Sequence, residues 1–124
     1  MKDFRRLKVW EKVHSLTLDI YKATARFPRE EMYGLTSQMR RCSASIGANI
    51  AEGCGKQGNN ELHRFLYIAS GSASELDYHL LLARDLEYLS DDDYQRIGQN
   101  LIEARRMLTA LLQKVSNDRF AANC

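Results

Sequence analysis

Two pairs of side chains have the types and the spacing that could hold a metal ion. Glu11 and His14 form a Glu-x-x-His motif, and Glu75 and His79 lie four residues apart. A ferritin-like di-metal site needs two Glu-x-x-His motifs and two further carboxylates that face the interior of a helical bundle. This sequence contains one such motif. We therefore expect no metal and no cofactor, with Glu11 and His14 facing solvent, and we keep a ferritin-like di-metal enzyme as an alternative.

Other catalytic chemistry has no local support in the sequence. The three cysteines, Cys42, Cys54 and Cys124, show no CxxC spacing, which argues against a zinc site and against a disulfide framework. No sequence context activates a serine or a cysteine as a nucleophile. The glycine-rich segment 53–60 lacks the spacing of a phosphate-binding loop. We expect reduced thiols and a protein that is not an enzyme.

Positive charge is concentrated in the first half of the chain. Residues 1–58 hold 11 Lys and Arg against 6 Asp and Glu (+5), whereas residues 59–124 hold 7 against 10 (−3). The candidates for contacts with the phosphates of RNA or DNA, or with another partner, are Arg40, Arg41, Lys56 and Arg64. The alternative for the arginine pair is structural, with one of the two bound to Glu52, to Glu75 or to a neighbouring subunit.

The segment from about 34 to 53 is predicted to be a helix with two distinct faces. Its apolar stripe, at the spacing of an α-helix, consists of Leu35, Met39, Cys42, Ile46 and Ile50. Small residues including Gly47 run beside the stripe, and Gly53 is expected in a left-handed conformation after the last turn. A second run of small residues, 70–74 around Gly71, lies in the third predicted helix. We expect these two runs to pack closely against each other.

Asn49 falls on the buried side of this predicted helix, between two isoleucines. A buried amide must find partners or cost roughly 1 to 3 kcal/mol. We expect Asn49 to bond to the third helix, either to a serine of 70–74 or to a backbone carbonyl near Gly71. Its role would be to fix the register of the two helices.

Apolar residues recur at helical spacing in four segments, about 7–27, 34–53, 61–88 and 91–115, which are joined by short connections. Pro28 ends the first segment, and Ser90 to Asp93 resembles a capping box before the fourth. No segment has the pattern of a strand. The sequence therefore predicts an all-α, antiparallel up-down-up-down four-helix bundle over residues 1–115, and a flexible C-terminal tail over 116–124.

The apolar pattern also bears on location and assembly. No apolar run approaches the ~20 residues that a membrane span needs, and no signal peptide is evident, so we expect a cytoplasmic protein with no membrane partner. Several helices carry more apolar residues than one bundle core requires, which is typical of subunit interfaces. The candidate interface residues are Trp10, Leu18 and Tyr21 on the first helix, and Phe65, Ile68, Leu82 and Leu86 on the third.

Several motifs together resemble the signature of one bacterial family of four-helix bundles. They are Phe27-Pro28, Tyr33-Gly34-Leu35, Ser45-Ile46-x-x-Asn49-Ile50-Ala51-Glu52-Gly53 and Glu61-Leu62-x-Arg64-Phe65-Leu66, followed by Gly71-Ser72-x-x-Glu75-Leu76. That family was first met as proteins encoded in intervening sequences of the large-subunit ribosomal RNA gene. It is related to the accessory variability determinant of diversity-generating retroelements.

The resemblance covers the chain from about Leu7 to Val115 and implies a four-helix protomer that assembles into a homopentameric ring. It implies little about activity. The residues that we expect to have structural roles are Asn49, Glu52, Gly53, Gly71 and Glu75. We expect a homo-oligomeric, non-enzymatic bundle protein, either an accessory or scaffold protein associated with RNA or DNA or a purely structural scaffold without a nucleic-acid ligand.

Overall fold

The computed structural model describes residues 3–123 of the chain, with side chains from 3 to 118. Four α-helices account for most of this part: α1 (Lys8–Thr24), α2 (Leu35–Gly55), α3 (Asn59–Asp85) and α4 (Asp91–Asn123). Two short 3₁₀ turns, η1 (Phe4–Arg6) and η2 (Arg29–Glu31), precede α1 and α2. No strand occurs between residues 3 and 123. The predicted all-α four-helix bundle is confirmed.

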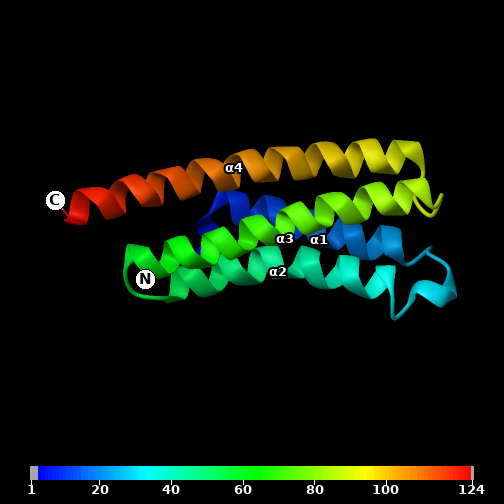
Figure 1. The fold of residues 1–124 in the computed structure, drawn as a ribbon, viewed down its shortest axis with the longest axis horizontal. Helices are drawn as coiled ribbons and strands as arrows, with labels where there is room; N and C mark the ends of the chain where they lie inside the picture. Colours follow the sequence, from blue (N-terminus) through cyan, green and yellow to red (C-terminus); the bar gives the residue numbers. More distant parts are fainter. Residues whose placement is uncertain (1–2, 124) are drawn as a thin grey trace.

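The helices are arranged as a square in cross-section. The backbone of α1 lies close to those of α2 and α4, and the backbone of α3 lies close to the same two, whereas the backbones of the two diagonal pairs, α1 with α3 and α2 with α4, lie further apart. Short connections make consecutive helices antiparallel, and the C-terminal end of α4 projects beyond the other three helices (Figure 1). Within the described residues, no helix combines the length and the apolar character that crossing a membrane requires.

The core is built from the heptad stripes of the four helices. On α3 every apolar residue of one heptad stripe is buried, namely Leu62, Leu66, Ala69, Ala73, Leu76, Leu80 and Ala83. Each of the other helices contributes a stripe of the same kind, represented by Leu16 and Ile20, by Met39 and Ile50, and by Ile97 and Leu101. Burial of these stripes, not helix propensity, provides most of the stability of such helices.

Gly53 was predicted to follow the last turn of α2, and this prediction is wrong. Gly53 lies inside the helix and is buried, and its φ is not positive. A Cβ atom at Gly53 would come within 2.9 Å of the Phe65 Cβ and 3.1 Å of the Leu62 Cδ1. The glycine therefore allows α2 and α3 to approach closely. The left-handed residue of the connection is Gly58, with φ +89°.

The fourth helix begins as predicted and ends later. The Ser90 hydroxyl accepts a hydrogen bond of 3.1 Å from the backbone amide of Asp93, which is an N-terminal cap. At the other end, α4 continues to Asn123 instead of stopping at Val115. The predicted end of the fourth helix at about residue 115 is therefore wrong. The flexibility predicted for 116–124 stays a prediction, and residue 124 lies outside the described part.

Candidate functional site

A groove runs along the outer surface between α1 and α2, with a volume of about 360 Å³. It is lined by Phe4, Trp10, His14, Thr17 and Tyr21, and on α2 by Ala44, Gly47, Ala48 and Ala51. The small residues of α2 thus face α1 and the groove. The expectation that they pack against the small residues 70–74 of α3 is wrong for Gly47, whose nearest neighbours are Trp10 and Val13.

Aromatic contacts hold one wall of the groove in place. The rings of Phe4 and Trp10 meet edge to face at 5.0 Å between centroids, and the Trp10 ring stacks on the His14 imidazole at 4.8 Å. Below them, the Thr17 hydroxyl lies 3.0 Å from the carbonyl oxygen of Ser43 and joins α1 to α2. His14 and Glu11 are exposed, as expected. Their Glu-x-x-His motif therefore does not face the interior of the bundle.

Arg40 has a structural position at the other end of this wall. Its Nε donates a 2.8 Å hydrogen bond to the Thr24 hydroxyl, and its Nη2 donates one of 3.2 Å to the Tyr21 carbonyl oxygen. The guanidinium also lies 4.8 Å from the centre of the Tyr21 ring, within the range of a cation–π contact. Arg40 thus binds the last turn of α1, and not Glu52 or Glu75. It also orients a ring that lines the groove.

The other three basic residues predicted to contact a partner differ in how strongly they interact with the rest of the chain. Arg64 forms a two-point ion pair with Glu61, with N–O distances of 3.1 and 3.2 Å, and lies 4.4 Å from the centre of the Phe65 ring. Its hydrogen bonds lower the pKa of the exposed Glu61 carboxyl. Lys56 lies 5.9 Å from the same ring. Arg41 is exposed and has no hydrogen bond or ion pair to the described residues.

Asn49 is half-buried, and it bonds within its own helix. Its Nδ2 donates to the carbonyl oxygen of Ser45 at 2.8 Å and to the Ser45 hydroxyl at 3.0 Å. The Ser45 hydroxyl in turn lies 3.0 Å from the hydroxyl of Ser72 on α3. The predicted direct bond from Asn49 to α3 is therefore wrong. Asn49 is linked to the serines of α3 through Ser45.

Two other motif residues of the sequence analysis are exposed on the surface of the bundle. Nothing lies within 4 Å of the position that a Cβ atom at Gly71 would take, so this glycine does not mark a close helix contact. Glu52 is also exposed, and no described side chain forms an ion pair with it.

Glu75 lies on α3 beside Cys42 of α2. Burial, and then the negative charge of Glu75, raise the pKa of the Cys42 thiol to about 12. A thiol with that pKa is almost fully protonated at neutral pH and is therefore a poor nucleophile. The contact between these two side chains does not support covalent catalysis by Cys42.

The residues predicted as an interface fall into three groups. Leu18, Tyr21, Ile68 and Leu86 are exposed, and Trp10 and Leu82 are half-buried. Phe65 is only 7% exposed because it packs against Gly53, so its assignment to an interface is wrong. The spacing of apolar residues alone did not show that Phe65, which lies outside the main stripe of α3, is buried within the protomer.

A set of exposed apolar side chains lies along α3. We call it the α3 ridge, and it consists of Tyr67 (69% exposed), Ile68 (40%), Tyr78 (60%) and Leu81 (37%). Of these, only Ile68 is among the interface residues predicted from the sequence. The exposure of the two tyrosines was not predicted, because a tyrosine in a helix can lie either at the edge of the core or on the surface.

Comparison with known proteins gives a family and a fold. Residues 5–110 match the family model described as 23S rRNA-intervening sequence protein. A crystal structure from Bacteroides thetaiotaomicron, described as a protein with unknown function from the S23 ribosomal protein family, is similar with a TM-score of 0.79. The two chains are 26% identical over 85% of this chain and 95% of that chain. No curated protein matches. Neither description names an enzymatic reaction.

Proposed function

The chain belongs to the 23S rRNA-intervening sequence protein family, and we propose that it is a non-enzymatic scaffold that assembles with copies of itself through the α1–α2 groove. The observation that carries this proposal is the groove itself. Its walls are aromatic, and its α2 side is made of alanines and a glycine. Small residues let another helix come close, and aromatic walls bury a large area around it.

The occupant that we propose is the α3 ridge of a second copy. The ridge supplies four exposed apolar side chains, including two tyrosines, which are enriched at interfaces. α3 lies diagonally across the square from α1. One chain can therefore offer its groove to one neighbour and its ridge to another.

This arrangement favours a ring. A contact between two different surfaces is heterologous, and repeated heterologous contacts close into a ring if the rotation permits, or continue as an open filament. The resemblance noted in the sequence implies five subunits, and we propose a homopentamer. The groove and the ridge do not by themselves fix the number.

The mass of the full-length protein in solution tests this proposal. We expect light scattering to give five times the chain mass of 14.3 kDa at micromolar concentration. Ala48→Glu should lower the assembly affinity at least about 100-fold, because it places an unpaired carboxylate in an apolar contact. Ser15→Glu, an exposed position on α1 outside the groove lining, is the matched control and should leave the mass unchanged. A wild-type monomer would contradict the proposal.

A further inference from the structure

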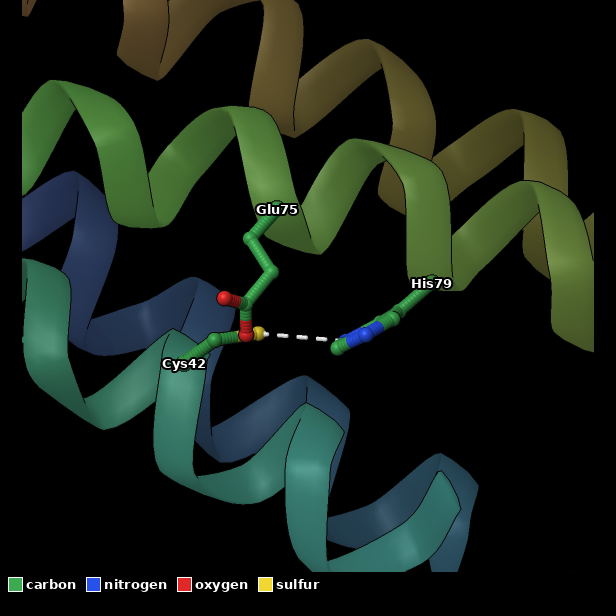
Figure 2. Close-up of side chains that lie close together, drawn as sticks. All are labelled: Cys42, Glu75 and His79. Atoms are coloured by element: carbon green, nitrogen blue, oxygen red, sulfur yellow. Dashed lines mark hydrogen bonds between the residues drawn. The ribbon is translucent and has the colours of Figure 1, made fainter.

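Three side chains that commonly bind metals meet where α2 and α3 pack together (Figure 2). Cys42 comes from α2, and Glu75 and His79 come from α3. The sulfur, one carboxylate oxygen and one imidazole nitrogen all lie within 4.8 Å of one another. Within the described part of the chain, no other group of three such side chains lies so close. The cluster is separate from the α1–α2 groove and shares no residue with it.

Helix geometry explains why the three donors converge. Glu75 and His79 are four residues apart on α3, so they project from the same face, one turn apart. That face meets α2 at Cys42 (Figure 2). Cys42 is 5% and His79 is 7% exposed, so packing restricts both side chains. Glu75 is exposed, and this gives an ion a route from solvent.

The distance between the two buried donor atoms, the Cys42 Sγ and the His79 Nδ1, matches tetrahedral coordination of a metal ion. Zn²⁺ binds thiolate sulfur at about 2.3 Å and imidazole nitrogen at about 2.0–2.1 Å, so tetrahedral angles place these two atoms about 3.6 Å apart. In the structure the Cys42 Sγ lies 3.6 Å from the His79 Nδ1. The Glu75 carboxylate, on a long exposed side chain, can move the short remaining distance.

The charge of the cluster also suits a cation. Glu75 forms no ion pair with a lysine or arginine among the described side chains. Burial and the negative charge of Glu75 together raise the pKa of the Cys42 thiol, which keeps its proton on the sulfur. A bound divalent cation would take the place of that proton, because a coordinating thiol is deprotonated outright.

We propose that Cys42, Glu75 and His79 form a binding site for one Zn²⁺ ion between α2 and α3. The sulfur, one carboxylate oxygen and Nδ1 supply three ligands, and water completes the tetrahedron. On binding, the Sγ–H bond breaks, the sulfur keeps the electron pair and bonds to zinc, and the proton passes to solvent. Nothing is oxidised or reduced.

Cobalt titration of chelator-treated, full-length protein tests the site. Co²⁺ substitutes for Zn²⁺, and a thiolate ligand gives it an intense charge-transfer absorption in the near ultraviolet. We expect this band in the wild type and its loss when Zn²⁺ is added. Cys42→Ser should abolish the band, whereas Cys54→Ser, a second buried cysteine on α2, should retain it. Circular dichroism checks that both variants are folded.

Glu75→Gln provides a test that does not disturb the core, because the side chain is exposed. Loss of this ligand should weaken cobalt binding by roughly tenfold or more, the effect that is seen even for groups one shell further out. Absence of the band from the wild type, or its persistence in folded Cys42→Ser, would overturn the proposal. Unchanged cobalt affinity in Glu75→Gln would remove the carboxylate from the site and overturn the three-ligand assignment.

Discussion

Trp10 of α1 lies beside Gly47 of α2, so that a Cβ atom at Gly47 would lie 3.4 Å from the Trp10 Nε1. The same helix carries Gly53, where a Cβ atom would lie 2.9 Å from the Phe65 Cβ. At Gly47 the added Cβ would be at an ordinary contact distance from the half-buried Trp10 ring. At Gly53 it would clash with the Cβ of the buried Phe65, an atom that cannot move without the backbone. These two glycines therefore serve different purposes.

Substitution of these glycines by alanine should change stability in opposite directions. Gly47→Ala should raise the free energy of unfolding by about 0.5–1 kcal/mol, because alanine favours the helix and fits beside Trp10. Gly53→Ala should lower it by about 1–3 kcal/mol through overpacking against Phe65. Gly71→Ala, which points into open space, is the control and should also be stabilising. Urea unfolding measures all three, and a stabilised Gly53→Ala would contradict the account.

The Ser45 hydroxyl should make a small contribution to stability by linking α2 to α3. Ser45→Ala removes the hydroxyl that Asn49 and Ser72 both contact, and it should cost about 0.5–1.5 kcal/mol. Ser15→Ala is the control, because that serine is exposed on α1. Thermal unfolding of the two variants decides the matter. Equal midpoints for both would show that the α2–α3 hydroxyl contact contributes nothing.

The two adjacent arginines should behave differently. Arg40→Ala removes two hydrogen bonds and a contact with the Tyr21 ring, so we expect a loss of about 1–3 kcal/mol. Arg41→Ala removes an exposed side chain without a partner and should stay within about 0.5 kcal/mol of the wild type. Unfolding curves in denaturant measure both. A larger loss for Arg41 would show that the assignment of the structural arginine is wrong.

Contacts with nucleic acid stay a prediction, and the structure narrows where to test them. Arg40 and Arg64 are engaged within the chain, so Arg41 is the first candidate among the four basic residues. We expect binding to structured RNA, single-stranded DNA or duplex DNA to weaken steeply with salt, and Arg41→Gln to reduce the salt slope by about one. Fluorescence anisotropy at several salt concentrations measures this. No binding at low salt would contradict the prediction.

Much of the fold could be read from the sequence because heptad stripes and caps are local signals. The stripe of α3 and the Ser90 cap of α4 are of this kind. The extension of α4 to Asn123 was missed because helix propagation needs no apolar stripe once the preceding turns are formed.

The candidate site was harder to predict because it depends on neighbours that are distant in the sequence. Nothing local shows that Arg40 reaches the end of α1, or that Cys42 meets Glu75 and His79. The contact of Asn49 with Ser45 was missed for a different reason. The spacing placed the amide near the core, but a residue four positions earlier offered it a closer partner.

The central claim, that the α1–α2 groove of one copy receives the α3 ridge of the next, is tested most directly by mixing two variants. Ala48→Glu blocks the groove and leaves the ridge intact, whereas Tyr78→Asp does the reverse. We expect each variant alone to be a monomer. Because each retains the surface that the other lacks, we expect an equimolar mixture to form a one-to-one dimer that cannot grow further. Sedimentation velocity resolves these species. A mixture that stays monomeric, or a single variant that keeps the wild-type mass, would contradict the claim.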